Sequence, residues 1–395
     1  MGIGLSFPGA RNDNLIFPIE AVFNRFYPRV AQGEVSVENF KEFSDNVLTF
    51  HMLNFAYLGT PLASSITEFI LNGTRIDRKA LQLINNPDLY KWTSISLNNC
   101  PEIKALDIVN FLTLQTQITK LEIESSKLEF HNLCQKGIDI SKYERLVISK
   151  NGEISNLDFL TIMPNLEYLD VSSCANLRLK PESFSNSQNL KVLKMRSIIP
   201  FYDMNRNNTI LAENIGCCLA TLPHLVELDL GFFGSAFTDI VMQAIIKNMP
   251  NLQTLKVCQS RITDRGVAGI ELDDFDSRLS PSTVIRRRAI VLERNNMNPP
   301  GYCLSRLVHL KNVSFSTCRD LSEATWKLAL RLPNLVALDI SFCGQISASG
   351  FSSVISNCPN LETLNILQCG LHITGSQELL DDAKLRLRRL RNLII

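Results

Sequence analysis

An α/β solenoid, in which every repeat contributes one parallel strand and one helix, is the fold class that the sequence predicts. Three observations predict it. A short apolar phrase, L-x-x-L-x-L, returns twelve times along the 395 residues, and most copies start 23 to 29 residues after the previous one. Helical patterns fill the intervals between copies. One such unit cannot bury both its strand and its helix, so neighbouring units are expected to stack into a continuous core.

The strand of each repeat is predicted by the phrase itself. Its first, fourth and sixth positions are apolar, and the fourth and sixth alternate as an inward-facing strand requires. A small Cys or Asn at position nine can satisfy backbone groups at the turn that follows. The clearest copies, which carry cysteine at position nine, start at Trp92, Leu166, Leu310, Leu335 and Leu361. The weaker copies start at Ile66, Ile118, Tyr143, Leu190, Leu225, Leu252 and Leu390.

The helix of each repeat follows an apolar anchor after the turn. In one copy Ile346-Ser347 is the anchor, and Phe351, Val354 and Ile355 then recur at three- and four-residue spacing. Pro359-Asn360 ends this helix and directs the next strand. The sequence therefore predicts a leucine-rich-repeat solenoid, a right-handed α/β horseshoe with a concave parallel sheet and convex helices.

Three segments interrupt the repeats. Residues 1–61 lack the phrase and predict an N-terminal helical cap, which either only covers the first repeat or also docks an adaptor. Residues 62–395 are predicted to form the solenoid of about twelve repeats, with insertions near 199–220 and 271–306. The first insertion is polar and predicts a loop. The second carries an acidic and then a basic run around a degenerate repeat near Arg287, and it is either a docking loop or a solvated excursion.

Composition narrows the class of partner and the compartment. A formal net charge of +1 gives no electrostatic case for nucleic-acid binding, and no apolar stretch reaches membrane-spanning length. Five of the eleven cysteines occupy position nine, and neither a C-x-x-C pair nor a signal peptide is found. This usage indicates the cytoplasm or the nucleus. The start of the sequence, Met1 to Ser6, fits the N-myristoylation pattern at Gly2, which would anchor the protein only weakly.

Motifs of catalysis are not found. The sequence has no P-loop, no G-x-G-x-x-G between strand and helix, no H-E-x-x-H and no G-x-S-x-G. His131 and Cys134 lack a second ligand pair, so no metal is expected there. His224 and His309 sit immediately before a phrase, where other repeats carry Asn. We therefore expect no enzyme activity, no cofactor and no metal.

The candidate site is the concave face. Positions three, five and seven of each phrase project from the sheet into solvent. Acidic and basic side chains alternate there from repeat to repeat, which would keep a sheet soluble through cross-strand ion pairs. Large aromatic rings in the same region favour a protein interface instead. The candidate protein-binding residues are Tyr168, Asp170, Lys194, Arg196, Glu227, Asp229, Phe232, Lys256 and Phe342.

A resemblance to a known family suggests the cellular pathway in which the protein acts. Residues 335–361 and the I-T-D-R-G-V segment at 262–267 resemble the cysteine-containing repeats of substrate-recognition subunits of cullin–RING ubiquitin ligases. The F-P-x-E helix at 17–20, followed by a short helical region, is similar in layout to the Zyg-eleven family. The same segment matches the adaptor-binding motif of F-box relatives only in part. The sequence departs from Zyg-eleven proteins because it shows no convincing elongin-binding box before Phe17 and no counterpart of their armadillo-like domain, which reads terminal glycine degrons, so degron recognition by that route is not expected.

The resemblance implies a non-catalytic substrate receptor. A protein substrate would bind the concave face, and an elongin or Skp-type adaptor with its cullin would bind the N-terminal cap. The alternative is a general interaction scaffold with no link to ubiquitin ligases. Neither hypothesis involves nucleic acid or stable membrane insertion.

Overall fold

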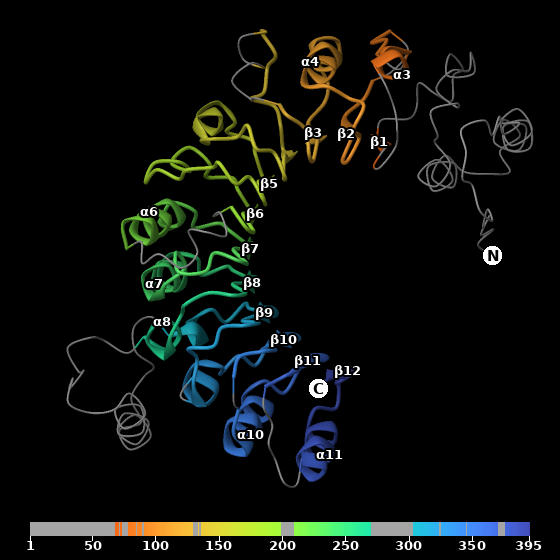
Figure 1. The fold of residues 1–395 in the computed structure, drawn as a ribbon. Coiled ribbons are helices and arrows are strands. Elements are labelled where there is room, and N and C mark those ends of the chain that lie inside the picture. Colours follow the sequence, from red (N-terminus) through yellow and green to blue (C-terminus); the bar gives the residue numbers. More distant parts are fainter. Residues whose placement is uncertain are drawn as a thin grey trace, which may run out of the picture.

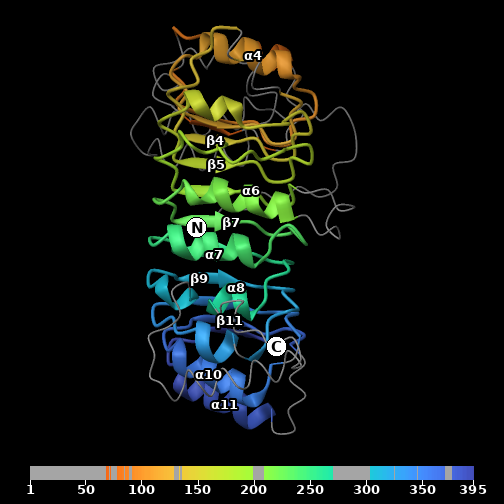
Figure 2. The ribbon, with the colours of Figure 1, turned by 90° about the vertical axis from the view of Figure 1, so that its left-hand side faces the viewer.

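The computed structural model is an α/β leucine-rich-repeat solenoid, as the sequence predicts. It describes residues 68–70, 72, 78–83, 85–88, 91–128, 133, 136–198, 209–269, 303–323, 325–344, 346–369 and 376–395. The strands line the inner side of an arc and the helices its outer side (Figure 1). Seen from the helical side, the helices are stacked along the length of the arc (Figure 2). The predicted cap at 1–61, Gly2, the Phe17–Glu20 helix and Arg287 lie outside the described residues.

Twelve short strands form one parallel sheet whose spatial order follows the sequence. Each strand occupies positions three to five of one phrase, and neighbouring strands pair position for position, as Leu338 with Leu364. The strands are β1 (Glu68–Ile70), β2 (Ser94–Ser96), β3 (Lys120–Glu122), β4 (Arg145–Val147), β5 (Tyr168–Asp170), β6 (Val192–Lys194), β7 (Glu227–Asp229), β8 (Thr254–Lys256), β9 (Asn312–Ser314), β10 (Ala337–Asp339), β11 (Thr363–Asn365) and β12 (Asn392–Ile394).

The helical side varies more than the strands do. Its α-helices are α3 (Arg78–Leu83), α4 (Ala105–Leu114), α6 (Thr209–Ala220), α7 (Asp239–Asn248), α8 (Asp264–Ala268), α10 (Ala348–Asn357) and α11 (Ser376–Arg386). Shorter turns replace a helix in other repeats: the 3-10 turns η4 (Asp158–Ile162) and η7 (Leu304–Arg306), and the π-helical turn η8 (Thr325–Ala329). Within the residues described, no helix is both long and apolar enough to cross a membrane.

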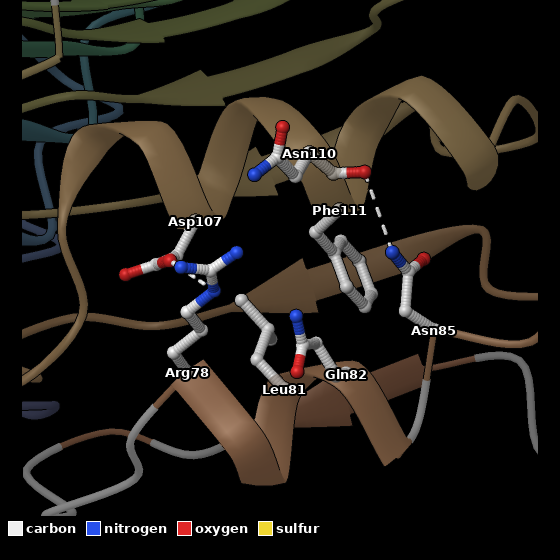
Figure 3. A pocket seen from close by; sticks show the side chains of 7 residues that line it. All are labelled: Arg78, Leu81, Gln82, Asn85, Asp107, Asn110 and Phe111. Carbon is white, nitrogen blue, oxygen red and sulfur yellow. Dashed lines mark hydrogen bonds and ion pairs between the residues drawn. The ribbon is translucent and has the colours of Figure 1, made fainter.

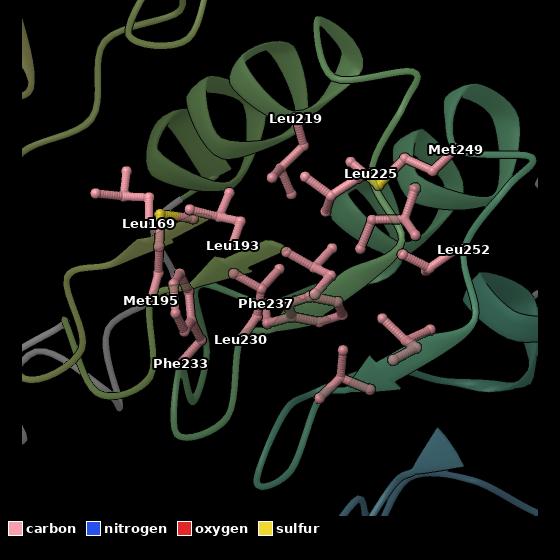
Figure 4. Packing of buried hydrophobic residues seen from close by; sticks show 14 of the residues in the cluster. Leu169, Leu193, Met195, Leu219, Leu225, Leu230, Phe233, Phe237, Met249 and Leu252 are labelled. Carbon is pink, nitrogen blue, oxygen red and sulfur yellow. The ribbon is translucent and has the colours of Figure 1, made fainter. Parts of the chain in front are cut away.

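The core lies between the sheet and the helices. Leu166, Leu169 and Val171, at positions one, four and six of one phrase, are fully buried. Figure 4 shows how such side chains from neighbouring strands, Leu193 among them, pack with helix residues such as Leu219. Burying one leucine of this kind contributes roughly 1.5–3 kcal/mol. The stack of identical positions therefore supplies most of the stability.

Four of the cysteines at position nine link their repeat to the one before it. The thiol of Cys343 donates a hydrogen bond to the carbonyl oxygen of Phe315 (2.9 Å), and that of Cys369 donates to Ile340 (2.8 Å). Cys174 and Cys318 make the same bond to Ile148 and Val257. In every case the acceptor is position six of the preceding phrase. The predicted role of position nine at the turn is confirmed.

These buried thiols should be chemically inert. Burial raises the pKa of Cys174 and of Cys318 to about 11, so at pH 8 only about one molecule in a thousand carries the reactive thiolate at either site. Cys217 is exposed on α6. We expect iodoacetamide at pH 8 to modify Cys217 within minutes and to leave Cys174 and Cys318 unmodified in the folded protein, as measured by peptide mass spectrometry. Equal labelling of all three would contradict the burial.

Asparagines at the residue before several of the phrases form a second series of bonds between repeats. The amide of Asn165 donates to the carbonyl of Ser141 (3.0 Å), and Asn189 donates to Pro164 (2.8 Å). Asn360 makes the equivalent bond to Pro333 (2.8 Å). His224 and His309 occupy this position in their own repeats and are exposed. Each donor satisfies a carbonyl in the loop of the preceding repeat, which fixes the spacing of the loops.

The long insertion does not interrupt the sheet. β8 pairs directly with β9, with Lys256 opposite Ser314, so no additional strand lies between them. The expected degenerate repeat near Arg287 therefore contributes no strand at this place. In the first insertion, the predicted loop at 200–208 lies outside the described residues, and α6 takes up the remainder.

Aspartates on the convex side connect repeats across that junction. Asp264, at the first turn of α8, accepts hydrogen bonds from the backbone N–H and hydroxyl groups of both Ser322 and Thr325, which come after the insertion. One repeat earlier, Asp239 accepts bonds from the backbone N–H of Thr263 (2.8 Å) and from its hydroxyl (2.7 Å). Burial raises the pKa of the Asp239 carboxyl. The carboxylates thus hold successive helix starts together.

A candidate protein-binding surface on the concave sheet

The nine residues predicted for the concave face lie on two separate stretches of it. Tyr168, Asp170, Lys194, Glu227 and Asp229 lie on β5, β6 and β7, with Arg196 and Phe232 in the turns just beyond. Lys256 ends β8, and Phe342 follows β10. The structure brings the residues of β5 to β7 into contact with one another. Asp229 is buried, whereas Phe342 is 42% exposed.

Ion pairs connect neighbouring strands on the first stretch, so adjacent repeats neutralise each other as the sequence suggests. Lys194 lies 3.3 Å from Glu227, and Arg196 lies 4.0 Å from Asp229. The series extends toward β3, where Arg145 lies 2.7 Å from Glu122. Partial burial opposes ionisation of Lys194, but contacts with Tyr168 and Glu227 outweigh it and raise the pKa of Lys194. These cations are largely satisfied within the protein.

Cationic side chains of the protein lie over the rings of two predicted aromatic anchors, Tyr168 and Phe232. The guanidinium carbon of Arg145 lies 3.5 Å from the centre of the Tyr168 ring, and the ammonium of Lys194 lies 5.3 Å from it. The guanidinium carbon of Arg196 lies 4.4 Å from the centre of the Phe232 ring. Cation–π contacts of this kind contribute about 0.5–1 kcal/mol at exposed sites. A partner that contacts either ring must therefore share it with an arginine.

Position eight of the phrase has a left-handed backbone in ten successive repeats. Its φ angles lie between 53° and 64° at Asn99, Ser125, Lys150, Ser173, Ser197, Phe232, Gln259, Thr317, Phe342 and Gln368. Most of these residues are polar, and Asn is well tolerated in this conformation. Phe232, Thr317 and Phe342 are bulky or β-branched, and such residues cost about 1–2 kcal/mol there. Because the conformation recurs in all ten repeats, it belongs to the turn after each strand, and it places Phe232 and Phe342 at this edge of the sheet.

A groove with a volume of about 720 Å³ occupies the second stretch of the concave face. This C-terminal groove runs from Glu227 on β7 to Ile394 on β12 and is open to solvent. Its lining includes Phe232, Thr254, Lys256, Asn312, Ser314, Thr317, Asp339, Thr363 and Asn365. Small hydroxyl and amide side chains predominate on β9 to β11, while the ion-paired Arg196 and Glu227 of the first stretch line the other end of the groove. The arrangement suits hydrogen bonding to a bound chain rather than chemistry on it.

Another hollow, on the convex side, is too small to hold a ligand. It lies between α3 and α4 and has a volume of about 20 Å³ (Figure 3), which is room for about one water. Arg78 lies 3.6 Å from Asp107 across it, and the amide of Asn85 donates to the carbonyl of Asn110 (3.3 Å). Within the described ranges no group of three or more His, Cys, Asp or Glu could hold a metal ion.

Several residues of the surface were not anticipated from the sequence. Arg145 and Glu122 extend the ion pairs, and Asn312, Ser314 and Asn365 line the groove. All of them occupy position three or five of a phrase. The same columns therefore contained the signal, but an ordinary serine or asparagine does not stand out until the fold places several together.

Comparison with known proteins bears on the fold alone. No protein-family model matches the sequence, and no curated protein matches it either. An internalin from Listeria monocytogenes superposes with a TM-score of 0.43 at 14% identity, covering 89% of this chain and 95% of that one. A leucine-rich-repeat protein from Leptospira interrogans gives 0.43 at 15%, covering 88% and 82%. The yeast Rad7 and Elc1 complex gives 0.39 at 16%, covering 88% and 87%.

Proposed function

We propose that this protein is a non-catalytic recognition module that holds a partner protein on its concave face. The observation that carries the proposal is the C-terminal groove of about 720 Å³ on the inner side of the sheet. Hydrogen-bonding side chains line it, and Phe232 stands at its edge in a strained conformation. A concave surface with aromatic anchors and a polar lining fits a protein ligand.

We further propose that the partner is a substrate of a cullin–RING ubiquitin ligase, for which this chain serves as receptor. Support comes from the cysteine-containing repeat subtype that the sequence resembles. Four position-nine cysteines bond to the preceding repeat, at Cys174, Cys318, Cys343 and Cys369. Adaptor and cullin would bind the segment before the repeats. Such a receptor would act in the cytoplasm or nucleus.

Affinity purification with quantitative mass spectrometry tests both parts. Replacing Tyr168 and Phe232 together with alanine should lower the recovery of the partner about tenfold, since buried aromatic anchors dominate protein interfaces. Recovery of cullin and adaptor should stay unchanged, because they bind elsewhere. The matched control is Ile240→Ala, which removes a 45% exposed side chain from the convex helix α7. This variant should recover the partner, the cullin and the adaptor as the wild type does.

The outcomes separate the alternatives. Equal recovery of the partner by the double variant and the wild type would contradict binding at these rings. Recovery of a partner without any cullin, elongin or Skp-type adaptor would contradict the ligase role and leave the general scaffold. Melting temperatures of all variants should be compared, because the double variant also loses its contacts with Arg145 and Arg196.

A further inference from the structure

Lys256 differs from four other cations of the concave face. Arg145, Lys150, Lys194 and Arg196 each lie within 4.0 Å of a carboxylate on a neighbouring strand or turn. Among the residues that the structure describes, Lys256 has no carboxylate partner within that distance. It lines the C-terminal groove and is only partly exposed. Its ammonium is therefore available to an anion that enters the groove.

Two carboxylates on the same face of the sheet, those of Asp229 and Asp339, accept hydrogen bonds from other groups. Asp229, directly across from Lys256, is buried and accepts a bond from the backbone N–H of Gly231 (3.0 Å) besides facing Arg196. Asp339 accepts a bond from the hydroxyl of Ser314 (3.0 Å) and two more from the backbone N–H and hydroxyl of Ser341. These bonds fix the positions of both carboxylates, and within the described ranges neither lies within 4.0 Å of the Lys256 ammonium.

The groove also offers hydrogen-bonding groups along its length. The Asn312 amide donates to the hydroxyl of Thr254 (3.1 Å), which leaves its Oδ1 without a protein donor in the described ranges. Asn365 Oδ1 accepts from the backbone N–H of Leu367 (3.1 Å), and its Nδ2 has no acceptor in the same ranges. One free acceptor and one free donor, on β9 and β11, suit the N–H and C=O groups of an extended main chain.

The dimensions suit a short segment. Six strands, β7 to β12, contribute to the lining, and at about 4.8 Å between strands the groove is roughly 24 Å long. An extended chain that rises about 3.3 Å per residue would place about seven residues across it. A nucleic-acid backbone fits poorly, because Glu227 and Asp339 also line the groove and would repel successive phosphates.

We propose that the C-terminal groove binds an extended segment of the partner protein that carries a single central Asp or Glu, with its carboxylate paired to Lys256. The proposal rests on the proposed function, since it specifies which part of the concave face holds the partner and by what chemistry. The main chain of the segment bonds to Asn312 and Asn365. An apolar side chain of the segment packs on Phe232 at the edge.

Selection from a randomised library of ten-residue peptides tests the acidic preference. The full-length wild-type protein should enrich peptides with Asp or Glu at one central position, about fivefold over the starting library, as one charge-assisted contact allows. Lys256→Gln should remove the enrichment. The control variant, Lys136→Gln, changes an exposed lysine outside the groove and should select the same acidic peptides as the wild type.

Direct affinities complete the test. A selected peptide and its Glu→Gln counterpart, both labelled with fluorescein, should differ about fivefold in their dissociation constants for the wild type. For Lys256→Gln the two peptides should have the same dissociation constant. Melting temperatures of the variants should stay within about 2 °C of the wild type, because Lys256 makes no ion pair with any described residue that its loss would break.

The results also distinguish this proposal from the proposed function. Selection without an acidic preference, or the same preference in Lys256→Gln, would overturn the inference about the groove. If the wild type and Lys256→Gln still recovered the same partner from cells, protein recognition would stand and its contact would lie elsewhere. If acidic peptides bound through Lys256 but no cellular protein were recovered, the chemistry of the groove would stand and the proposed function would fall.

Discussion

Replacing Asp264 with alanine is expected to lower the free energy of unfolding by about 3 kcal/mol or more, the largest loss we predict for a single polar side chain of this protein. Asp264 is buried and accepts four hydrogen bonds, from the N–H and hydroxyl groups of Ser322 and Thr325. Alanine leaves all four donors without their acceptor. All four belong to residues that are buried or partly buried, and water can replace a lost partner only where it has access.

The same substitution should change how the protein unfolds. In a solenoid each repeat is stabilised by its neighbours alone. Asp264 bonds across the junction between β8 and β9, where 58 residues separate it from Ser322. Weakening this interface should separate the repeats before the insertion from those after it. We therefore expect the single urea transition, followed by circular dichroism, to broaden or split in Asp264→Ala.

A matched control is available in an exposed aspartate. The carboxylate of Asp158 is 63% exposed and lies 3.1 Å from Lys180. Such surface pairs contribute about 0–1 kcal/mol. Asp158→Ala should therefore shift the urea midpoint little and leave one transition. A loss for Asp264→Ala as small as this would show that the bonds across the insertion do not hold the two parts together.

The repeating features of the fold were predictable because they obey one period. Each strand coincides with positions three to five of a phrase, and thiols such as Cys343 bond where position nine predicts. Even the left-handed backbone at position eight recurs at fixed spacing. A period in the sequence specifies such features because every repeat solves the same packing problem with the same positions.

The binding role of individual side chains was less predictable, because it depends on the direction of side chains and not only on their columns. The columns identified Tyr168, Phe232 and Arg196, but not Arg145, and they did not show that the two arginines cover the two rings. They gave Lys194 and Lys256 equal standing, although only Lys194 has an ion-pair partner in the described part of the chain. Neighbouring strands decide which charges remain free, and their register is visible only in the folded sheet.

Non-periodic segments also limit how much of the fold can be predicted from the sequence. The 58-residue interval between the phrases at Leu252 and Leu310 could hold two repeats by length, yet β8 pairs directly with β9. Length alone cannot distinguish a weak repeat from an insertion, because a strand of three residues needs little sequence to specify it. The buried bonds of Asp264 to Ser322 explain how the stack continues without an intervening strand.

Alanine at two helical glycines should have opposite effects on stability. At Gly266 on α8, a new Cβ would lie 2.3 Å from Oδ1 of Asp239 and 2.9 Å from its Cα. The second contact is with backbone, so a rotation of the Asp239 side chain cannot relieve it. The first would displace the carboxylate that accepts two bonds from Thr263. We expect Gly266→Ala to lower the free energy of unfolding by about 2 kcal/mol or more.

At Gly216 on α6, by contrast, the new Cβ would meet Ala244 Cβ at 3.6 Å and Ile240 Cγ2 at 3.8 Å, which are ordinary packing distances. Alanine favours the helix over glycine by about 1 kcal/mol, so Gly216→Ala should raise the free energy of unfolding by up to that amount. Urea unfolding of the two variants measures both signs in one experiment. Because helix propensity favours alanine at both positions, a loss at Gly266 alone must come from the close approach of α7 and α8. If Gly266→Ala were as stable as Gly216→Ala, the contact with Asp239 could not be what positions these helices. The bonds of Asp239 to Thr263 would then not hold the two helix starts together.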